Sequence, residues 1–179
     1  MIDEKSLYRQ LNNPSTKEAA FTHLVHEYQE PLYWQIRRMV LSHDDADDVL
    51  QNTFIKAWSA IDSFRGESRL QTWLFRIAIN ESLNFLSKKK QTVSLDQTAG
   101  IMADMLASDS YFDGDEVQQQ FQEAICTLPE KQRLVFNLKY FDEMKYEDMS
   151  TLLGTSIGAL KASYHHAVKK ISSFFQDND

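Results

Sequence analysis

Apolar residues recur three and four positions apart over long stretches of this 179-residue chain, which is the spacing of one buried helix face. In the N-terminal half this pattern predicts three helices, over residues 16–41, 44–61 and 70–90. Their expected inward residues are Phe21, Leu24, Val25, Tyr28, Leu32, Ile36 and Met39, then Val49, Phe54, Ala57, Trp58 and Ile61, then Trp73, Leu74, Ile77, Ala78, Leu83 and Leu86. Pro31 is expected to kink or divide the first helix. The chain shows no alternating β-rich run and has only 5 Gly and 3 Pro, so the predicted fold is all-α.

A second pattern near the C-terminus predicts two helices joined by a tight turn. Apolar residues of the segment 145–153 fall on one helix side, and Gly154 follows directly, where a helix ends best in a left-handed residue. Thr155 and Ser156 offer a hydroxyl to cap the next helix. Inside that helix the expected buried stripe is Leu160, Tyr164, Ala167, Val168 and Ile171. This arrangement predicts a helix-turn-helix, and a helical hairpin that only packs is the alternative.

The outward face of the last helix has the character of a DNA-reading surface. Small residues at its start allow close approach to base edges, and lysines can contact phosphates. The outward residues, proposed to contact DNA, are Ser156, Gly158, Ala159, Lys161, Ala162, Ser163, His165, His166 and Lys169. We expect this helix to enter a major groove.

The net charge of −7 is unevenly distributed and so does not exclude DNA binding. Residues 65–90 hold six basic side chains and two acidic ones, whereas residues 91–130 hold eight acidic side chains and no basic one. The stretch 91–115 also has the composition of a linker. The predicted organisation is therefore a helical domain over 1–90, an acidic flexible linker over 91–115 and a helix-turn-helix domain over 116–179. The apolar linker residues Ile101, Met102, Met105 and Leu106 are expected to dock on a surface.

The single cysteine, Cys126, excludes a disulfide within the chain and fits a reducing compartment. No apolar run approaches the length of a membrane span, and no signal peptide is evident. We expect a cytoplasmic location.

The helix predicted over 70–90 combines aromatic and basic residues, which suits single-stranded DNA. Trp73 and Phe75 can stack on bases and Arg69, Arg76 and Asn80 can contact the backbone. The alternative is that both aromatic residues belong to the core.

Two segments together resemble a known family. The segment DDADDVLQNTFIKAWSAIDSFRGESRLQTWLFRIAINESLNFLSKKK resembles region 2 of extracytoplasmic-function sigma factors, and LPEKQR with GALKASYHHAVKK resembles their region 4. The resemblance covers about residues 16–90 and 116–175. It implies two small helical domains that bind core RNA polymerase, recognise the −35 and −10 promoter elements and begin DNA melting.

The resemblance also implies roles for individual residues. The surface that docks on the clamp helices of the largest polymerase subunit corresponds to Asp47, Asp48, Gln51, Asn52 and Phe54, and the C-terminal domain is expected to meet the flap region. The loop 64–68 resembles the one that captures a base flipped from the −10 element, which a pocket must hold to offset the unstacking. Phe64, Ile77 and Asn80 are the candidates for that pocket, and the strand backbones would be held by Arg65, Arg69, Arg76, Lys88, Lys89 and Lys90.

Three positions depart from the family pattern. Asn52 stands where relatives usually have Glu, and Ser163 and His166 stand where arginines are common. Fewer fixed charges imply that phosphate contacts contribute less to DNA affinity, and protonation of His165 and His166 would make binding depend on pH.

The linker acids Asp104, Asp109, Asp113 and Asp115 are expected to occupy positively charged nucleic-acid paths in the polymerase.

Parts of the sequence are also compatible with two other classes of function. A stand-alone helix-turn-helix regulator would share only the C-terminal half and would bind duplex DNA without polymerase. The aspartates of DDADD match the DDxxD pattern of Mg²⁺-dependent isoprenoid synthases, but no second carboxylate cluster or nucleophile motif accompanies them. We therefore expect no catalytic residue, metal, cofactor or small-molecule substrate. The expected partners are core RNA polymerase, promoter DNA and an anti-sigma factor of a kind often anchored in a membrane.

Overall fold

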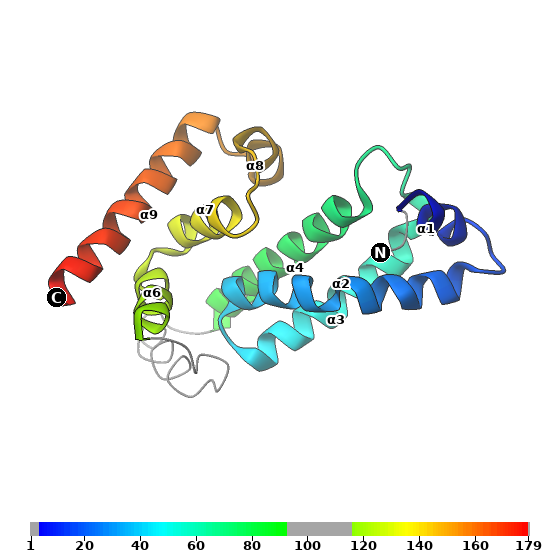
Figure 1. Ribbon diagram of the computed structural model, residues 1–179, viewed down its shortest axis with the longest axis horizontal. Helices are drawn as coiled ribbons and strands as arrows, with labels where there is room; N and C mark the ends of the chain where they lie inside the picture. Colours follow the sequence, from blue (N-terminus) through cyan, green and yellow to red (C-terminus); the bar gives the residue numbers. More distant parts are fainter. Residues whose placement is uncertain (1–3, 93–115, 179) are drawn as a thin grey trace. The chain divides into compact units, whose positions relative to one another are not determined.

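The structure, a computed structural model, describes residues 4–92 and 116–178 and shows two separate helical units (Figure 1). The first unit comprises Met1–Thr92 and the second Val93–Asp179. Every regular element in the described ranges is a helix, as the sequence predicted. The apolar residues at 101, 102, 105 and 106 and the linker acids lie outside the described residues. No helix in the described ranges is long and apolar enough to cross a membrane.

Three long helices form the body of the first unit, and each packs on the other two: α2 (Lys17–Val40), α3 (His43–Ala60) and α4 (Leu70–Thr92). Their core contains Leu24, Leu32, Ile36, Val49 and Leu74, all almost completely buried. Of the two effects predicted for Pro31, a kink or a division of the first helix, the division is wrong, because Pro31 is exposed inside a continuous α2. The aspartates do lie in the first turn of α3, where Ser42 caps the helix by accepting a hydrogen bond from the Asp45 N–H at 3.4 Å.

The N-terminal helix α1 (Glu4–Leu11) did not emerge from the sequence pattern, because eight residues give too few repeats to reveal a period. Leu7 and Leu11 are buried, and α1 packs on α2. A 3₁₀ turn, η1 (Ile61–Ser63), follows α3 and leads into the loop before α4. We call residues 64–69 the α3–α4 loop.

Several residues predicted to face inward do not. Trp58 is 41% exposed, and its indole packs at the surface on the Phe21 ring, with the Lys17 ammonium 4.8 Å from its ring centroid. Val168 is 39% exposed, because Ala167 takes the inward position beside it. Among the α4 side chains that the structure describes, the buried ones besides Leu74 and Ala78 are Leu70, Ile79 and Ser82. The predicted inward residues Trp73, Ile77, Leu83 and Leu86 are only half-buried, so the core face of α4 is rotated from the predicted stripe.

The second unit is built from α6 (Glu116–Thr127), α7 (Glu130–Tyr140), α8 (Tyr146–Leu153) and α9 (Ile157–Asn178). Helices α6, α7 and α8 all pack on α9. The Phe136 ring lies in the core and stacks on the rings of Tyr140 and Tyr164, with centroids 5.2 and 5.7 Å away. Arg133 is buried in α7, and this burial lowers its pKa from the ordinary value.

The predicted turn between α8 and α9 is confirmed. Gly154 ends α8 in the left-handed conformation with φ 61°, and its N–H donates to the Ser150 carbonyl at 3.0 Å. Of the two candidate hydroxyls, Ser156 caps α9 by accepting from the Ala159 N–H at 3.3 Å. Thr155 instead donates to the carbonyl of Leu153.

Two glycines, Gly154 in this turn and Gly158 in the first turn of α9, allow a matched stability test. An added Cβ meets nothing within 4 Å at either Gly154 or Gly158, so only backbone conformation separates them. We expect Gly154→Ala to destabilise the second unit by about 1 kcal/mol, because an L-residue is disfavoured at positive φ. Gly158→Ala, inside a helix, should stabilise it by about 0.5 kcal/mol.

The measurement is urea unfolding of the full chain, followed by circular dichroism and by tryptophan fluorescence. All three tryptophans lie in the first unit, so their fluorescence transition should stay unchanged and serves as the internal control. Equal effects of the two alanines would contradict the assignment of the turn.

Candidate nucleic-acid and polymerase interface

The α3–α4 loop is held in place from both sides by aromatic contacts to Phe64. This side chain is only 8% exposed. Its ring lies edge-on to Tyr8 of α1, with centroids 5.6 Å apart, and is tilted against Trp73 of α4 at 5.1 Å. The loop therefore begins at a residue buried between the N-terminal helix and α4.

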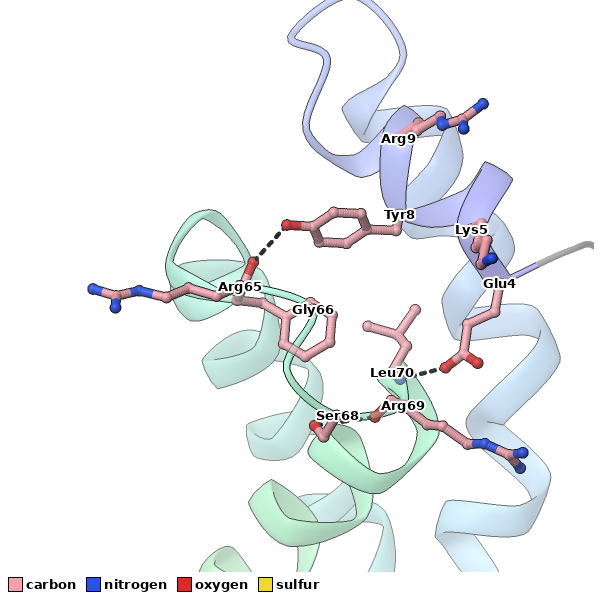
Figure 2. A pocket seen from close by; sticks show the side chains of 10 residues that line it. Glu4, Lys5, Tyr8, Arg9, Arg65, Gly66, Ser68, Arg69 and Leu70 are labelled. Atoms are coloured by element: carbon pink, nitrogen blue, oxygen red, sulfur yellow. Dashed lines mark hydrogen bonds between the residues drawn. The ribbon is translucent and has the colours of Figure 1, made fainter.

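Two hydrogen bonds from α1 add to this attachment (Figure 2). The Tyr8 hydroxyl donates to the backbone carbonyl of Phe64 at 3.2 Å. The Glu4 carboxylate accepts from the backbone N–H of Leu70, the first residue of α4. A carboxylate at this place satisfies a helix-terminal donor and interacts favourably with the helix dipole. Helix α1 thus anchors both ends of the loop.

The residues proposed to contact the −10 element lie on this loop and on the exposed side of α4. Ile77 is half-buried and lies one helical turn beyond Trp73, and Asn80 is exposed about two turns beyond it. Arg65 and Arg69 are exposed on the loop, and Arg76 is half-buried. Because the Phe64 ring is already packed between two aromatic side chains, it can form a wall of a pocket but offers little open surface.

One of the three lysines at the end of α4, Lys89, is engaged in contacts within the first unit. The Lys89 ammonium lies 2.6 Å from the Asp45 carboxylate on α3 and 5.6 Å from the Phe85 ring centroid. Lys88 is exposed, and the side chain of Lys90 lies outside the described residues. Lys89 therefore joins α4 to the start of α3.

The residues proposed to bind polymerase share the outer surface of α3. Asp47, Asp48, Gln51 and Asn52 are exposed, and Phe54 is half-buried. Sequence reasoning overlooked Ile55, which is 59% exposed and lies one turn beyond Gln51 on the same helix side. The exposure of Ile55 could have been predicted, because its position falls outside the inward stripe expected for α3. With Trp58, 41% exposed and three positions further along, it places two large apolar side chains on the surface of α3.

In the second unit, the proposed DNA-reading residues of α9 lie together on its outward side. Gly158, Ala159, Lys161, Ala162, His165, His166 and Lys169 are all exposed, and Ser163 is half-buried. Ser156 is exposed at the cap. The Tyr146 ring of α8 supports this side, since the Lys139 and Lys161 ammonium groups lie 5.1 and 5.7 Å from its centroid. Burial raises the pKa of Tyr146, with a smaller contribution from Tyr164, so its hydroxyl stays neutral near neutral pH.

Two of the four aspartates that suggested a metal site have other partners. Asp45 pairs with Lys89, and the Asp47 carboxylate lies 3.5 Å from Nε2 of His43. Within the ranges that the structure describes, no group of three or more His, Cys, Asp or Glu residues is placed to hold a metal ion.

Comparison with known proteins gives consistent matches to both units. The family model for sigma-70 region 2 matches residues 24–92, and the one for sigma-70 region 4 matches residues 118–171. The ECF RNA polymerase sigma factor SigW of Bacillus subtilis is 31% identical, covering 88% of this chain and 90% of that protein. The RNA polymerase sigma-H factor of Pseudomonas aeruginosa is 32% identical, covering 88% and 86%.

Solved structures show the same fold. The sigma factor RpoE of Bartonella quintana, in complex with the anti-sigma factor NepR, matches with a TM-score of 0.69 and 25% identity over 87% of this chain and 96% of that one. CnrH, in complex with the cytosolic domain of CnrY, matches in fold with a TM-score of 0.67 over 98% and 99% of the two chains.

The anchoring of the loop by α1 is testable with a single hydroxyl deletion. Tyr8→Phe keeps the ring contact to Phe64 but removes the hydrogen bond to its carbonyl, and we expect a loss of about 1 kcal/mol in unfolding free energy. Amide hydrogen exchange in residues 64–70 should become faster. Tyr140→Phe, an exposed tyrosine of the second unit, is the control. Unchanged exchange in the loop would show that the hydroxyl does not hold it.

Proposed function

The chain belongs to the extracytoplasmic-function sigma factors, and on that premise we propose how its two units divide promoter recognition. Such a protein supplies promoter specificity to bacterial RNA polymerase and is not itself a catalyst. The observation that carries the assignment is the match of region 2 to the first unit and of region 4 to the second, in that order along one chain. The first unit would act at the −10 element and the second at the −35 element.

At the −10 element, the proposal is that the α3–α4 loop and α4 hold the unpaired strand. Asn80 is exposed and can hydrogen-bond the edge of a flipped base, while the half-buried Ile77 supplies an apolar wall. Arg65, Arg69 and Arg76 would contact phosphates, because a guanidinium donates two parallel hydrogen bonds to an anion. The anchored loop favours capture, since less conformational freedom is lost when a rigid loop binds.

At the −35 element, α9 would enter the major groove with its N-terminal half. The small side chains of Gly158, Ala159 and Ala162 allow close approach to the bases, and Lys161 and Lys169 lie where phosphates would be met. His165 and His166 present exposed ring nitrogens as donors or acceptors.

For the polymerase, the outer surface of α3 is the proposed docking site for the clamp helices of the largest subunit, and the second unit would meet the flap region. Ile55 adds an apolar contact to the polar residues Asp48, Gln51 and Asn52. Because Asn52 replaces the Glu usual in the family, a larger share of the affinity here would come from such apolar contact.

We also propose regulation by an anti-sigma factor and a cytoplasmic location. The similar RpoE was solved in complex with the anti-sigma factor NepR. By analogy, exposed apolar side chains such as Ile55 and Trp58 are available to an inhibitor in the free protein.

The central test is run-off transcription on genomic fragments, with core RNA polymerase in the presence and absence of this protein. We expect new discrete transcripts, and we expect Asn80→Ala to reduce them about tenfold or more, by loss of the base contact. Asn84→Ala, an exposed asparagine one turn further along α4, is the matched control. A sharp footprint by the protein alone, with no transcripts, would instead indicate the stand-alone regulator.

A second test addresses the α3 surface. Ile55→Ser removes an exposed apolar side chain without opening the core, so the fold should be retained while affinity for core polymerase falls about tenfold. Val117→Ser, a similarly exposed aliphatic residue of the second unit, should leave this affinity unchanged. Fluorescence anisotropy of the labelled chain titrated with core polymerase measures both. Equal affinities would exclude Ile55 from the contact.

A further inference from the structure

Tyr8 lies on a helix that is itself fixed to the body of the first unit. Its neighbours Leu7 and Leu11 are buried, and α1 packs on α2. Tyr8 is half-buried and lines a recess of about 510 Å³ between α1 and the α3–α4 loop. The region 2 family model matches residues 24–92, so α1 lies outside the matched segment. The family match therefore assigns no role to Tyr8.

The Tyr8 side chain contacts the loop in three ways. Its hydroxyl donates to the Phe64 carbonyl at 3.2 Å (Figure 2), and its ring lies edge-on to the Phe64 ring, with centroids 5.6 Å apart. The loop backbone also lies over the Tyr8 ring at Gly66, because a Cβ at this glycine would be 3.5–3.8 Å from three ring atoms. That distance is ordinary van der Waals contact, so the constraint at Gly66 is its φ of +72°. Tyr8 thus supports the loop at its buried start and again two residues further on.

Few other contacts hold the loop in place. The recess shows that α1 and the loop are not packed together along their whole length. Arg65, Gly66 and Arg69 are exposed. Among the described residues, the side-chain hydrogen bonds that reach this stretch from another element come from Tyr8, to the Phe64 carbonyl, and from Glu4, to the Leu70 N–H. The position of the loop therefore depends on a small number of contacts, and Tyr8 makes several of them.

We infer that Tyr8 is a positioning residue for base capture and sets how strictly the site selects the captured base. The inference rests on the proposed function, in which the loop and α4 hold that base. The link is Phe64, whose ring contacts Tyr8 on one side and Trp73 of α4 on the other. A site discriminates between ligands only when its walls and donors are held to within about 0.5 Å of the productive geometry. Tyr8 acts through the loop, since its hydroxyl bonds the Phe64 carbonyl and the loop backbone lies over its ring.

The experiment uses holoenzyme and a promoter found by the run-off assay. The captured position is the one in the −10 element at which an abasic site weakens open-complex binding most. Promoter fragments then carry each of the four bases at that position, and open-complex affinity is measured for each. The selectivity ratio is the affinity for the native base divided by the affinity for the next best base. A fraction of unfolded protein lowers both affinities equally, so this ratio does not report stability.

Two variants of Tyr8 separate the hydroxyl from the ring. Tyr8→Leu removes both and should lower the selectivity ratio about tenfold. Tyr8→Phe keeps the ring contacts and should lower the ratio about threefold, the scale of one neutral hydrogen bond. Affinity for core polymerase should be unchanged in both variants, because the proposed docking residues lie on α3.

Val49→Ala is the control for stability, because it opens a cavity in the core of the same unit on α3 and leaves α1 and the loop unaltered. Its selectivity ratio should equal that of the wild type. A wild-type ratio in Tyr8→Leu would overturn the inference, and so would an equal fall of the ratio in Val49→Ala. Absence of any transcript with wild-type protein, or of any base preference in the −10 element, would instead count against the proposed function.

Discussion

The packing of the Phe64 ring between Tyr8 and Trp73 is the contact on which the proposed strand-binding surface depends. It joins α1 to the α3–α4 loop and α4, and α1 lies outside the segment that the region 2 family model matches. Aromatic pairs at such distances contribute beyond simple burial, and the Tyr8 hydroxyl adds a directional bond to the same residue. The loop is thus attached at its start by Phe64 and at its end by Glu4. A loop held at both ends can present its arginines with little loss of freedom on binding.

Among the described residues of the first unit, three lysines form ion pairs, whereas the two arginines of the α3–α4 loop form none. Lys17, Lys56 and Lys89 each pair with an acidic residue far away in sequence, and so they link helix to helix. Arg65 and Arg69 have no such pairing within the described first unit and lie around the loop. Exposed ion pairs of this kind add little stability. A chain with a net charge of −7 therefore still presents a cationic surface where nucleic acid is expected.

Helix α9 contributes both to the core of the second unit and to its proposed DNA-reading surface. The inward side of α9 buries Leu160, Ala167 and Ile171 against the preceding helices, while the residues proposed to read DNA lie on its exposed outward side. Gly154 sets the direction of α9 by ending α8 in a left-handed turn that an L-residue resists. Small substitutions in this turn should therefore affect stability and DNA recognition together.

The sequence by itself determined the all-α class, the three long helices of the first unit, the Gly154 turn and the family, because helical periodicity, glycine at a helix end and two extended motifs are local signals. It did not reveal α1, whose eight residues are too few to show a period. It also placed Trp58 and Val168 inside, because periodicity gives a helix face but not how far the neighbouring helices cover it. The burial of Phe64, the pairing of Lys89 with Asp45 and the recess beside Tyr8 were decided by tertiary structure alone. Each of them joins residues more than forty positions apart, and such contacts form only when the helices pack.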